Sequence, residues 1–274
     1  MSLLLIDSAS LWYRAYYGMP DTLLSPDGEP VNAVRGYFDM VSRLILQYKP
    51  NRVIAAIEGD WRPSWRVELF ADYKANRVDE VGGEEEPDLL TPQIPIILEG
   101  LDALGIPVIG VDDFEADDII ATFAKEAERE KIEVLISTGD RDSFQLISEH
   151  ITVLYPRKGM SDLARMTPDA VVEKYGLTPA QYHDFAALRG DPSDNLPSVP
   201  GVGEKTATKW IQEFGDIKGL VTNAPSIPGK AGDSLRENLK SVLLNHELTQ
   251  LIHDVAVGAS VNELEWHPHL AQDA

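Results

Sequence analysis

The chain has 274 residues, 43% of them hydrophobic, which allows one large domain or a main domain with an annex and excludes a disordered chain. It has no cysteine, which excludes a disulfide framework, and no apolar run approaching a membrane span or a signal peptide, so we expect a cytoplasmic protein without a membrane partner. The formal net charge of −21 disfavours a nucleic-acid partner unless the cations are gathered in one place, because phosphate binding needs a basic surface.

Apolar runs of strand length alternate with segments of helical spacing in the first part of the chain. The expected strands are 3–6, 52–57, 106–110, 132–137 and 151–155, and the expected helices are 8–17, 31–48, 95–105, 114–131 and 141–147. Such alternation, with strands that are almost wholly apolar, is typical of a parallel sheet covered by helices on both faces. The predicted fold class is therefore α/β, with a mostly parallel central sheet.

The pattern changes near residue 160, where helical segments begin to follow one another. The one further strand that we expect is Val255–Gly258. We therefore divide the chain into an α/β core at 1–160 and a helical region at 161–274.

Carboxylates follow four of the expected strands. They are Asp7, then Glu58 and Asp60, then Glu115, Asp117 and Asp118, and finally Asp140 and Asp142. Any one of them could simply cap a helix, since aspartate at a strand-to-helix junction is a good N-cap. Together, however, they lie at the carboxyl ends of parallel strands, where α/β proteins bind ligands. So many acids repel one another unless protons or cations neutralise them.

Oxygen ligands without cysteine favour magnesium or manganese. Two such ions can activate a water and stabilise the leaving oxygen in phosphodiester cleavage. A further pair of acids, Asp191 and Asp194, would project the same way if their segment were helical, although the prolines around them oppose a helix.

Five segments resemble the 5′ nuclease (flap endonuclease) family, which includes the N-terminal nuclease domain of bacterial DNA polymerase I. They are LLIDSASLWYRAYY, WRVELFADYKANR, FEADDIIATFAKEA, ISTGDRDSFQLIS and DFAALRGDPSDNLPSVPGVGEKTATKWIQEFG. They occur in the family's order from residue 3 to about 215. Because polymerase sequences are absent, we expect a stand-alone nuclease or an isolated domain. The resemblance implies a PIN-like core.

The resemblance also implies that the acids hold two or more magnesium or manganese ions. The implied metal ligands are Asp7, Glu115, Asp117, Asp118, Asp140, Asp142, Asp191 and Asp194. After the second strand the family usually has an aspartate, whereas this chain offers Glu58 and Asp60. We keep both, with Glu58 slightly favoured as the equivalent residue and Asp60 as an additional ligand.

Cations and aromatic residues gather between Trp61 and Arg77. The segment could be an amphipathic helix with a solvated basic face, but the resemblance implies a helical arch over the active site, at about 61–90. Lys74 and Arg77 would then stabilise charge on the scissile phosphate. Arg66 would be a supporting phosphate contact, and Tyr73 would stack on a base. The acidic stretch 78–88 is unusual for a DNA gateway, and we expect it to be mobile and to face away from DNA.

A Gly-x-Gly turn lies in the sequence PGVGEKTATKW. Alone it is a weak signal, but it resembles the helix–hairpin–helix element of 5′ nucleases, expected here at about 195–215 and often built around a potassium ion. Gly201, Gly203, Lys205 and Thr206 would then hold duplex DNA by its backbone, without reading its sequence.

The expected function is that of a structure-selective 5′ nuclease, acting as a 5′–3′ exonuclease and 5′-flap endonuclease. Its partner would be DNA with a 5′ end or 5′ flap at a duplex junction, including RNA–DNA primers, in replication and repair, and the protein would be a monomer. The alternatives are a DNA-junction-binding module without catalytic activity and a related nuclease that cleaves RNA.

Overall fold

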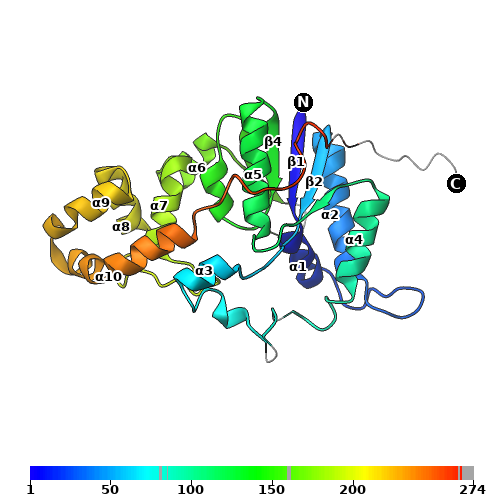
Figure 1. Cartoon of the computed structure of the whole chain (residues 1–274), viewed down its shortest axis with the longest axis horizontal. Coiled ribbons are helices and arrows are strands. Elements are labelled where there is room, and N and C mark those ends of the chain that lie inside the picture. The colour runs from blue at the N-terminus through cyan, green and yellow to red at the C-terminus, as the bar shows by residue number, and fades with distance from the viewer. Residues whose placement is uncertain (80–81, 85, 159–161, 265, 267–274) are drawn as a thin grey trace.

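The fold is built around one β-sheet. The computed structural model describes residues 1–79, 82–84, 86–158, 162–264 and 266, and within these ranges the sheet has six strands in the order β3-β2-β1-β4-β5-β6. Figure 1 shows β4, β1 and β2 side by side. The first five strands are parallel, and β6 runs antiparallel to β5. The strands are β1 (Ser2–Asp7), β2 (Arg52–Ala56), β3 (Val108–Ile109), β4 (Glu133–Ser137), β5 (Ile151–Pro156) and β6 (Leu163–Met166).

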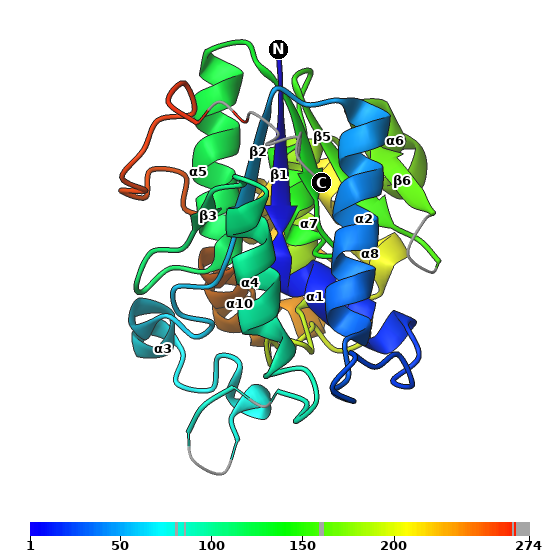
Figure 2. The ribbon, with the colours of Figure 1, turned by 90° about the vertical axis from the view of Figure 1, so that its right-hand side faces the viewer.

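Helices cover both faces of the sheet, as Figure 2 shows for α5 and α2 on opposite sides of β1. The helices of this part are α1 (Ser8–Gly18), α2 (Asn32–Tyr48), α3 (Ser64–Leu69), α4 (Gln93–Ala103) and α5 (Ala116–Arg129). Along β1, Leu3 and Leu5 pack into the cluster that includes α5, whereas Leu4 and Ile6 pack into the cluster that includes α1, α2 and α4. Because alternate side chains enter opposite cores, the strand is apolar throughout.

The order of the strands reverses at β1, which has β2 on one side and β4 on the other. The chain therefore leaves β1 and β4 in different directions, and a crevice opens at their carboxyl ends. In Figure 2, β1 points toward the end of the molecule where α3 and the segment after it lie. This end is where the predicted acids should meet.

A helical region lies beside the sheet (Figure 1). Its helices are α6 (Pro168–Tyr175), α7 (Pro179–Arg189), α8 (Glu204–Phe214), α9 (Ile217–Asn223) and α10 (Gly229–Leu248), and the chain also has short 3-10 helices η1 (Ala75–Arg77), η2 (Asp142–Leu146) and η3 (Ala224–Ser226). The predicted α/β class with a helical annex is confirmed. The expectation of no strand soon after residue 160 was wrong, because β6 pairs with β5 at the edge of the sheet.

After α10 the chain runs back along α5 without forming a strand, so the strand expected at Val255–Gly258 is also absent. The backbone N–H of Ile252 donates to Asp118 and that of Val255 to the Thr122 hydroxyl. One turn further along α5, Glu126 accepts from the backbone N–H of Val261. The last part of the described chain is thus pinned to three successive turns of α5. None of the described helices has the length and apolar character needed to cross a bilayer.

Candidate active site

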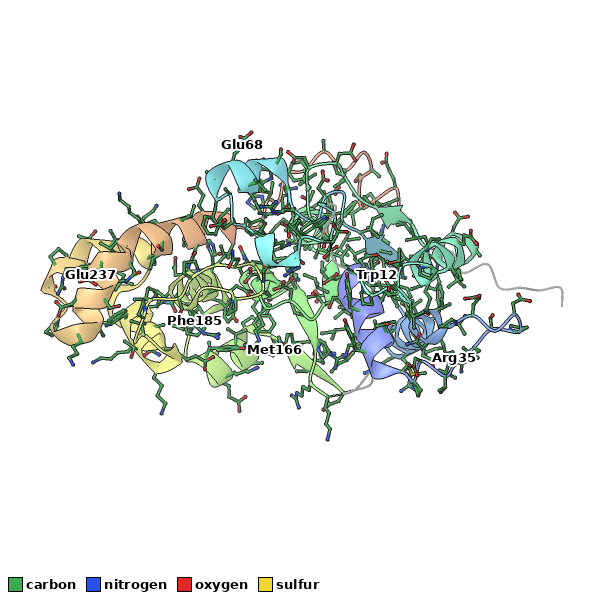
Figure 3. The ribbon with its side chains drawn as sticks, turned by 90° about the horizontal axis from the view of Figure 1, so that it is seen from below. Trp12, Arg35, Glu68, Met166, Phe185 and Glu237 are labelled. Carbon is green, nitrogen blue, oxygen red and sulfur yellow. The ribbon has the colours of Figure 1, made fainter. Side chains whose placement is uncertain are left out.

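A cavity of about 610 Å³ lies at the carboxyl ends of the parallel strands. Figure 3 views this end of the molecule, with Trp12 of the cavity wall near the middle and Glu68 of α3 pointing outward. Eight of the ten predicted carboxylates line the cavity, together with the side chains of Lys74 and Arg77. These eight are Asp7, Glu58, Asp60, Glu115, Asp117, Asp140, Asp142 and Asp194.

Asp7 links β1 to the neighbouring strand β4. Its Oδ1 accepts from the backbone N–H of Ser10, which caps α1, and its Oδ2 accepts from the Thr138 hydroxyl at 2.6 Å. The same Thr138 oxygen accepts from the backbone N–H of Asp140, whose carboxylate accepts from the N–H of Asp142. Burial raises the pKa of Asp7 and of Asp140. The acidic turn after β4 is therefore an ordered structure tied to the end of β1.

Glu115 is the most heavily paired acid of the cavity. It caps α5, and its carboxylate accepts from the hydroxyl of Tyr73 at 2.9 Å and contacts the Arg66 guanidinium at 3.0 Å and the Lys74 ammonium. Burial alone would raise the pKa of Glu115, but the charges of Lys74 and Arg66 outweigh it and lower that pKa. Glu115 is therefore ionised and internally neutralised.

Asp117, by contrast, is a half-buried acid that lacks such compensation. Within the described chain, no donor reaches its Oδ1. Burial, followed by the charges of Asp140 and Asp7, raises the pKa of Asp117 well above its usual range. As the side chains stand, no three acids or histidines of the described residues are arranged to hold a metal ion. The Glu115 carboxylate forms an ion pair with Lys74 instead. The oxygen-only donor set and the orphaned Asp117 oxygen nevertheless fit a divalent cation.

The geometry favours Glu58 over Asp60 as the acid that follows β2. Glu58 accepts from the backbone N–H of Ala116 at the start of α5, and burial followed by the charge of Glu115 raises its pKa to about 8. Asp60 is exposed and accepts from the backbone N–H of Asp113. Asp60 thus holds a turn at the cavity edge.

Asp118 and Arg66 differ from their predicted roles. Arg66, expected to contact a phosphate, is 2% exposed, and both of its terminal nitrogens bond the Asp118 carboxylate. Asp118 does not line the cavity, because Arg66 and the backbone N–H of Ile252 already satisfy its oxygens. The pair fixes α3 to the first turn of α5, with neither side chain free for DNA or metal.

Tyr73 also departs from its predicted role of stacking on a base. The residue is 2% exposed and packs with Leu196 and Leu248, and its hydroxyl donates to Glu115. With both ring faces covered, Tyr73 supports the cavity wall and cannot stack on a base in this conformation.

The predicted arch is mostly not helical. Between β2 and α4 the described residues form α3, η1 and connecting turns. The segment docks onto the loop after α7, where the guanidinium of Arg77 pairs with Asp194 at 2.7 Å and the backbone N–H of Lys74 donates to the carbonyl of Asp194. The acidic stretch 78–88, of which residues 80, 81 and 85 lie outside the described residues, was expected to face away, but Glu84 and Glu86 line the cavity.

Asp191 and Asp194 come from a turn, not from a helix. Asp194 lines the main cavity, whereas Asp191 lines a second cavity beside it. The Gly-x-Gly turn lies between α7 and α8, where Gly201 has φ +76° and Gly203 precedes the first turn of α8. Lys205 is exposed and Thr206 half-buried on that turn.

Sequence reasoning missed Thr138, whose hydroxyl joins Asp7 to Asp140. Its position directly after a buried strand was an available signal. It also missed the stacking of His183 on His246, with ring centroids 4.1 Å apart, for which helical spacing offers no clue because 63 residues separate them. Arg141 lies between two cavity acids in the sequence, and its guanidinium contacts Tyr155.

Comparison with solved structures supports the fold. The flap endonuclease of bacteriophage T5, in a complex with DNA and metal ions, has a TM-score of 0.73 at 20% identity, covering 92% of this chain and 90% of that one. The T5 5′-exonuclease with bound zinc has a TM-score of 0.72 with the same identity and coverage. This chain therefore has the same fold as the two T5 nuclease structures.

Sequence relatives are closer. A 5′–3′ exonuclease of Streptomyces coelicolor is 50% identical over 224 residues, which are 79% of this chain and 73% of the relative. One from Mycobacterium tuberculosis is 40% identical over 272 residues, or 94% of this chain and 85% of the relative. DNA polymerase I of Mycobacterium bovis is 50% identical over 268 residues, which are 97% of this chain but only 29% of that protein.

Two family models together match most of the chain. The N-terminal resolvase-like domain of 5′–3′ exonucleases matches residues 2–176, and their C-terminal SAM fold matches residues 177–272. Considered with the acidic cavity at the carboxyl ends of the sheet, these matches show that the chain belongs to the 5′–3′ exonuclease family.

Proposed function

We propose that this nuclease cuts DNA at the junction between a duplex and a 5′ single strand, acting as an exonuclease at 5′ ends and as an endonuclease at 5′ flaps. The observation that supports this best is the cavity in which eight carboxylates meet Lys74 and Arg77. Its acids can hold cations, while Lys74 and Arg77 can meet a phosphate, and both kinds of group are needed to hydrolyse a phosphodiester.

The proposed cofactor is Mg²⁺ or Mn²⁺, with two or more ions in the cavity. The residues that would hold them are Asp7, Glu58, Glu115, Asp117, Asp140, Asp142 and Asp194, with Asp60 and Asp191 at the margins and Asp118 positioning the start of α5. When bound, such ions supply Lewis-acid stabilisation of the phosphate oxygens and lower the pKa of water.

Lys74 and Arg77 are the proposed catalytic cations. They now neutralise Glu115 and Asp194, and the same charges would stabilise the negative charge that develops as the phosphodiester breaks. One water adds to phosphorus and the bond to the 3′ oxygen breaks, which leaves a 5′-phosphate and a 3′-hydroxyl.

The helical region is the proposed duplex-binding part. Gly201 and Gly203 bear no side chain that would keep a backbone phosphate away, and Lys205 and Thr206 add a charge and a hydroxyl on the next turn, with K⁺ as a proposed ligand of the hairpin. Since β6 completes the sheet, we place the border between core and helical region after Met166 rather than at residue 160. We further propose a cytoplasmic monomer that also processes RNA–DNA primers.

The test is cleavage of a labelled 5′-flap DNA with and without Mg²⁺, by the native chain and by Asp117→Asn. We expect cutting at the junction by the native chain, loss of at least 100-fold in Asp117→Asn (roughly the effect of losing one transition-state stabilising group), and none in EDTA. Binding without cutting by the native chain would favour the non-catalytic module. Equal cutting of single-stranded RNA would favour the RNA nuclease.

A further inference from the structure

A second cavity, of about 320 Å³, lies directly beside the first. The two cavities share Gly139, Asp140, Asp142 and Thr249, so the acidic turn after β4 forms most of the wall between them. The opposite side of the second cavity is formed by the end of α7 and the residues that follow it, including Asp191. This cavity therefore lies between the acidic cavity and the α7–α8 hairpin.

The wall of the second cavity is acidic, because Asp140, Asp142 and Asp191 all line it. These carboxylates repel a DNA backbone, so a strand that passes here needs positive charge on the same side. Among the described lining residues, the cations are Arg141 and Arg189, one from each side of the cavity.

Arg141 is exposed and is held by an aromatic partner. Its Nε donates to the Tyr155 hydroxyl at 3.2 Å, and its guanidinium carbon lies 5.8 Å from the centre of that ring. In the described structure its printed partner is Tyr155 and not a carboxylate, although Asp140 and Asp142 are its immediate neighbours in sequence. These contacts orient the guanidinium and leave donors for a further acceptor.

Arg189, the last residue of α7, has a similar arrangement. Its guanidinium lies over the ring of Phe185 at 5.5 Å, and it pairs with Glu204, the first residue of α8, at 3.2 Å. The Glu204 side chain is 60% exposed, and an ion pair of that kind is weak enough for a phosphate to replace the carboxylate. Arg189 thus stands where the second cavity meets the hairpin.

We propose that Arg141 and Arg189 together bind a backbone phosphate of duplex DNA next to the scissile one, on the side opposite Lys74 and Arg77. The inference rests on the proposed function. It assigns a positioning role, because a strand held on both sides of the reacting phosphate cannot slide or rotate out of line. Guanidinium groups suit this role, since they bind phosphate oxygens through two parallel hydrogen bonds.

The test measures binding of the 5′-flap DNA by the full chain in EDTA, where no cutting occurs, over a range of salt concentrations. Arg141→Gln and Arg189→Gln should each weaken binding roughly tenfold, as expected for a charge-assisted contact, and should each reduce the slope of log K against log salt by about 0.9. Arg141→Lys keeps the charge and should keep the slope. The matched control is Arg165→Gln, which removes an exposed arginine over the Tyr48 ring, 5.7 Å away, outside both cavities.

A second arm locates the phosphate by replacing single phosphates near the junction with neutral methylphosphonates. At one position the native chain should lose about tenfold in affinity (one charge-assisted contact), while the double variant Arg141→Gln/Arg189→Gln should lose nothing further. If the native chain cuts flap DNA but the two variants keep its salt slope and show no such position, the inference is wrong and the proposed function stands. If the native chain neither binds nor cuts flap DNA, both fail.

Discussion

Arg66 and Asp118 form a buried, two-pronged ion pair, with Nη1–Oδ2 at 2.9 Å and Nη2–Oδ1 at 3.0 Å, and neither side chain is more than 3% exposed. Because a buried charge that loses its partner keeps its desolvation penalty, Arg66→Met should lower the free energy of unfolding by roughly 3 to 5 kcal/mol. Urea unfolding measures the change. Arg66→Met/Asp118→Leu should regain part of the loss, whereas a double variant less stable than the single one would contradict this account.

Asp117→Asn should stabilise the metal-free protein while it abolishes cutting. Burial and the neighbouring charges raise the pKa of Asp117, so its ionised form is unfavourable in the folded state and the neutral amide removes that repulsion. We expect the Tm in EDTA to rise by about 2 to 4 °C, as for roughly 1 kcal/mol in a chain of this size. A Tm below that of the native chain would show that Asp117 is already compensated.

Glu58 should make the metal-free protein less stable as the pH rises. Its pKa is about 8 in the folded protein, mainly through burial, whereas the unfolded chain releases this proton near the ordinary value of 4.5. The folded state therefore holds the extra proton, and stability is lost between these values at up to about 1.4 kcal/mol per pH unit. Urea unfolding at pH 6 and pH 8 in EDTA should show a smaller difference for Glu58→Gln. An equal difference would exclude Glu58 as the cause.

His183 should make the protein less stable as the pH falls, the opposite of the effect of Glu58. Burial, followed by the charge of His246, lowers the pKa of His183 to about 4, so the folded state resists a proton that the unfolded chain accepts near 6.5. Stability is complete above pH 6.5 and falls as the pH decreases toward 4, by roughly 3 kcal/mol in total. His183→Gln keeps a donor for the His246 carbonyl and should flatten this limb between pH 7 and pH 5. An unchanged limb would place the titrating group elsewhere.

Gly190→Ala should destabilise the turn after α7, whose Asp191 and Asp194 line the second and the main cavity. Gly190 has φ +62°, and an added Cβ would lie 2.5 Å from the Leu196 carbonyl oxygen and 2.6 Å from the Pro197 backbone. Strain and clash together should cost about 2 kcal/mol or more in urea unfolding. The matched control is Gly201→Ala, where φ is +76° but no atom lies within 4 Å, so only the strain of roughly 1 kcal/mol remains. Equal losses at both positions would mean that the close contact relaxes freely.

Much of the core could be predicted because its signals are local. Buried parallel strands must be apolar on both faces, so the sequence indicates β1, β2 and β4 clearly. The acids that follow these strands must then meet at one edge of the sheet. β6 was not predicted because it is a four-residue edge strand with Arg165 exposed in its middle. So short a segment shows almost no alternation of apolar and polar residues.

The environment of each charged side chain could not be predicted from local pattern. Arg66 and Tyr73 belong to a segment whose composition suits a surface as well as a wall, and their partners Asp118 and Glu115 lie 52 and 42 residues away. Only the tertiary fold decides that Arg66, Tyr73 and Lys74 are nearly buried in the cavity wall, while the Arg77 side chain stays partly exposed.

The segment that follows α10 and pins itself to three turns of α5 has a mechanical consequence. Two chain connections join the helical region to the core, namely the one that enters α6 and the segment that returns along α5, and the two parts also share one hydrophobic cluster. With two connections, the helical region cannot rotate away from the core about a single one. We therefore expect the helical region to keep its position beside the core when a substrate binds.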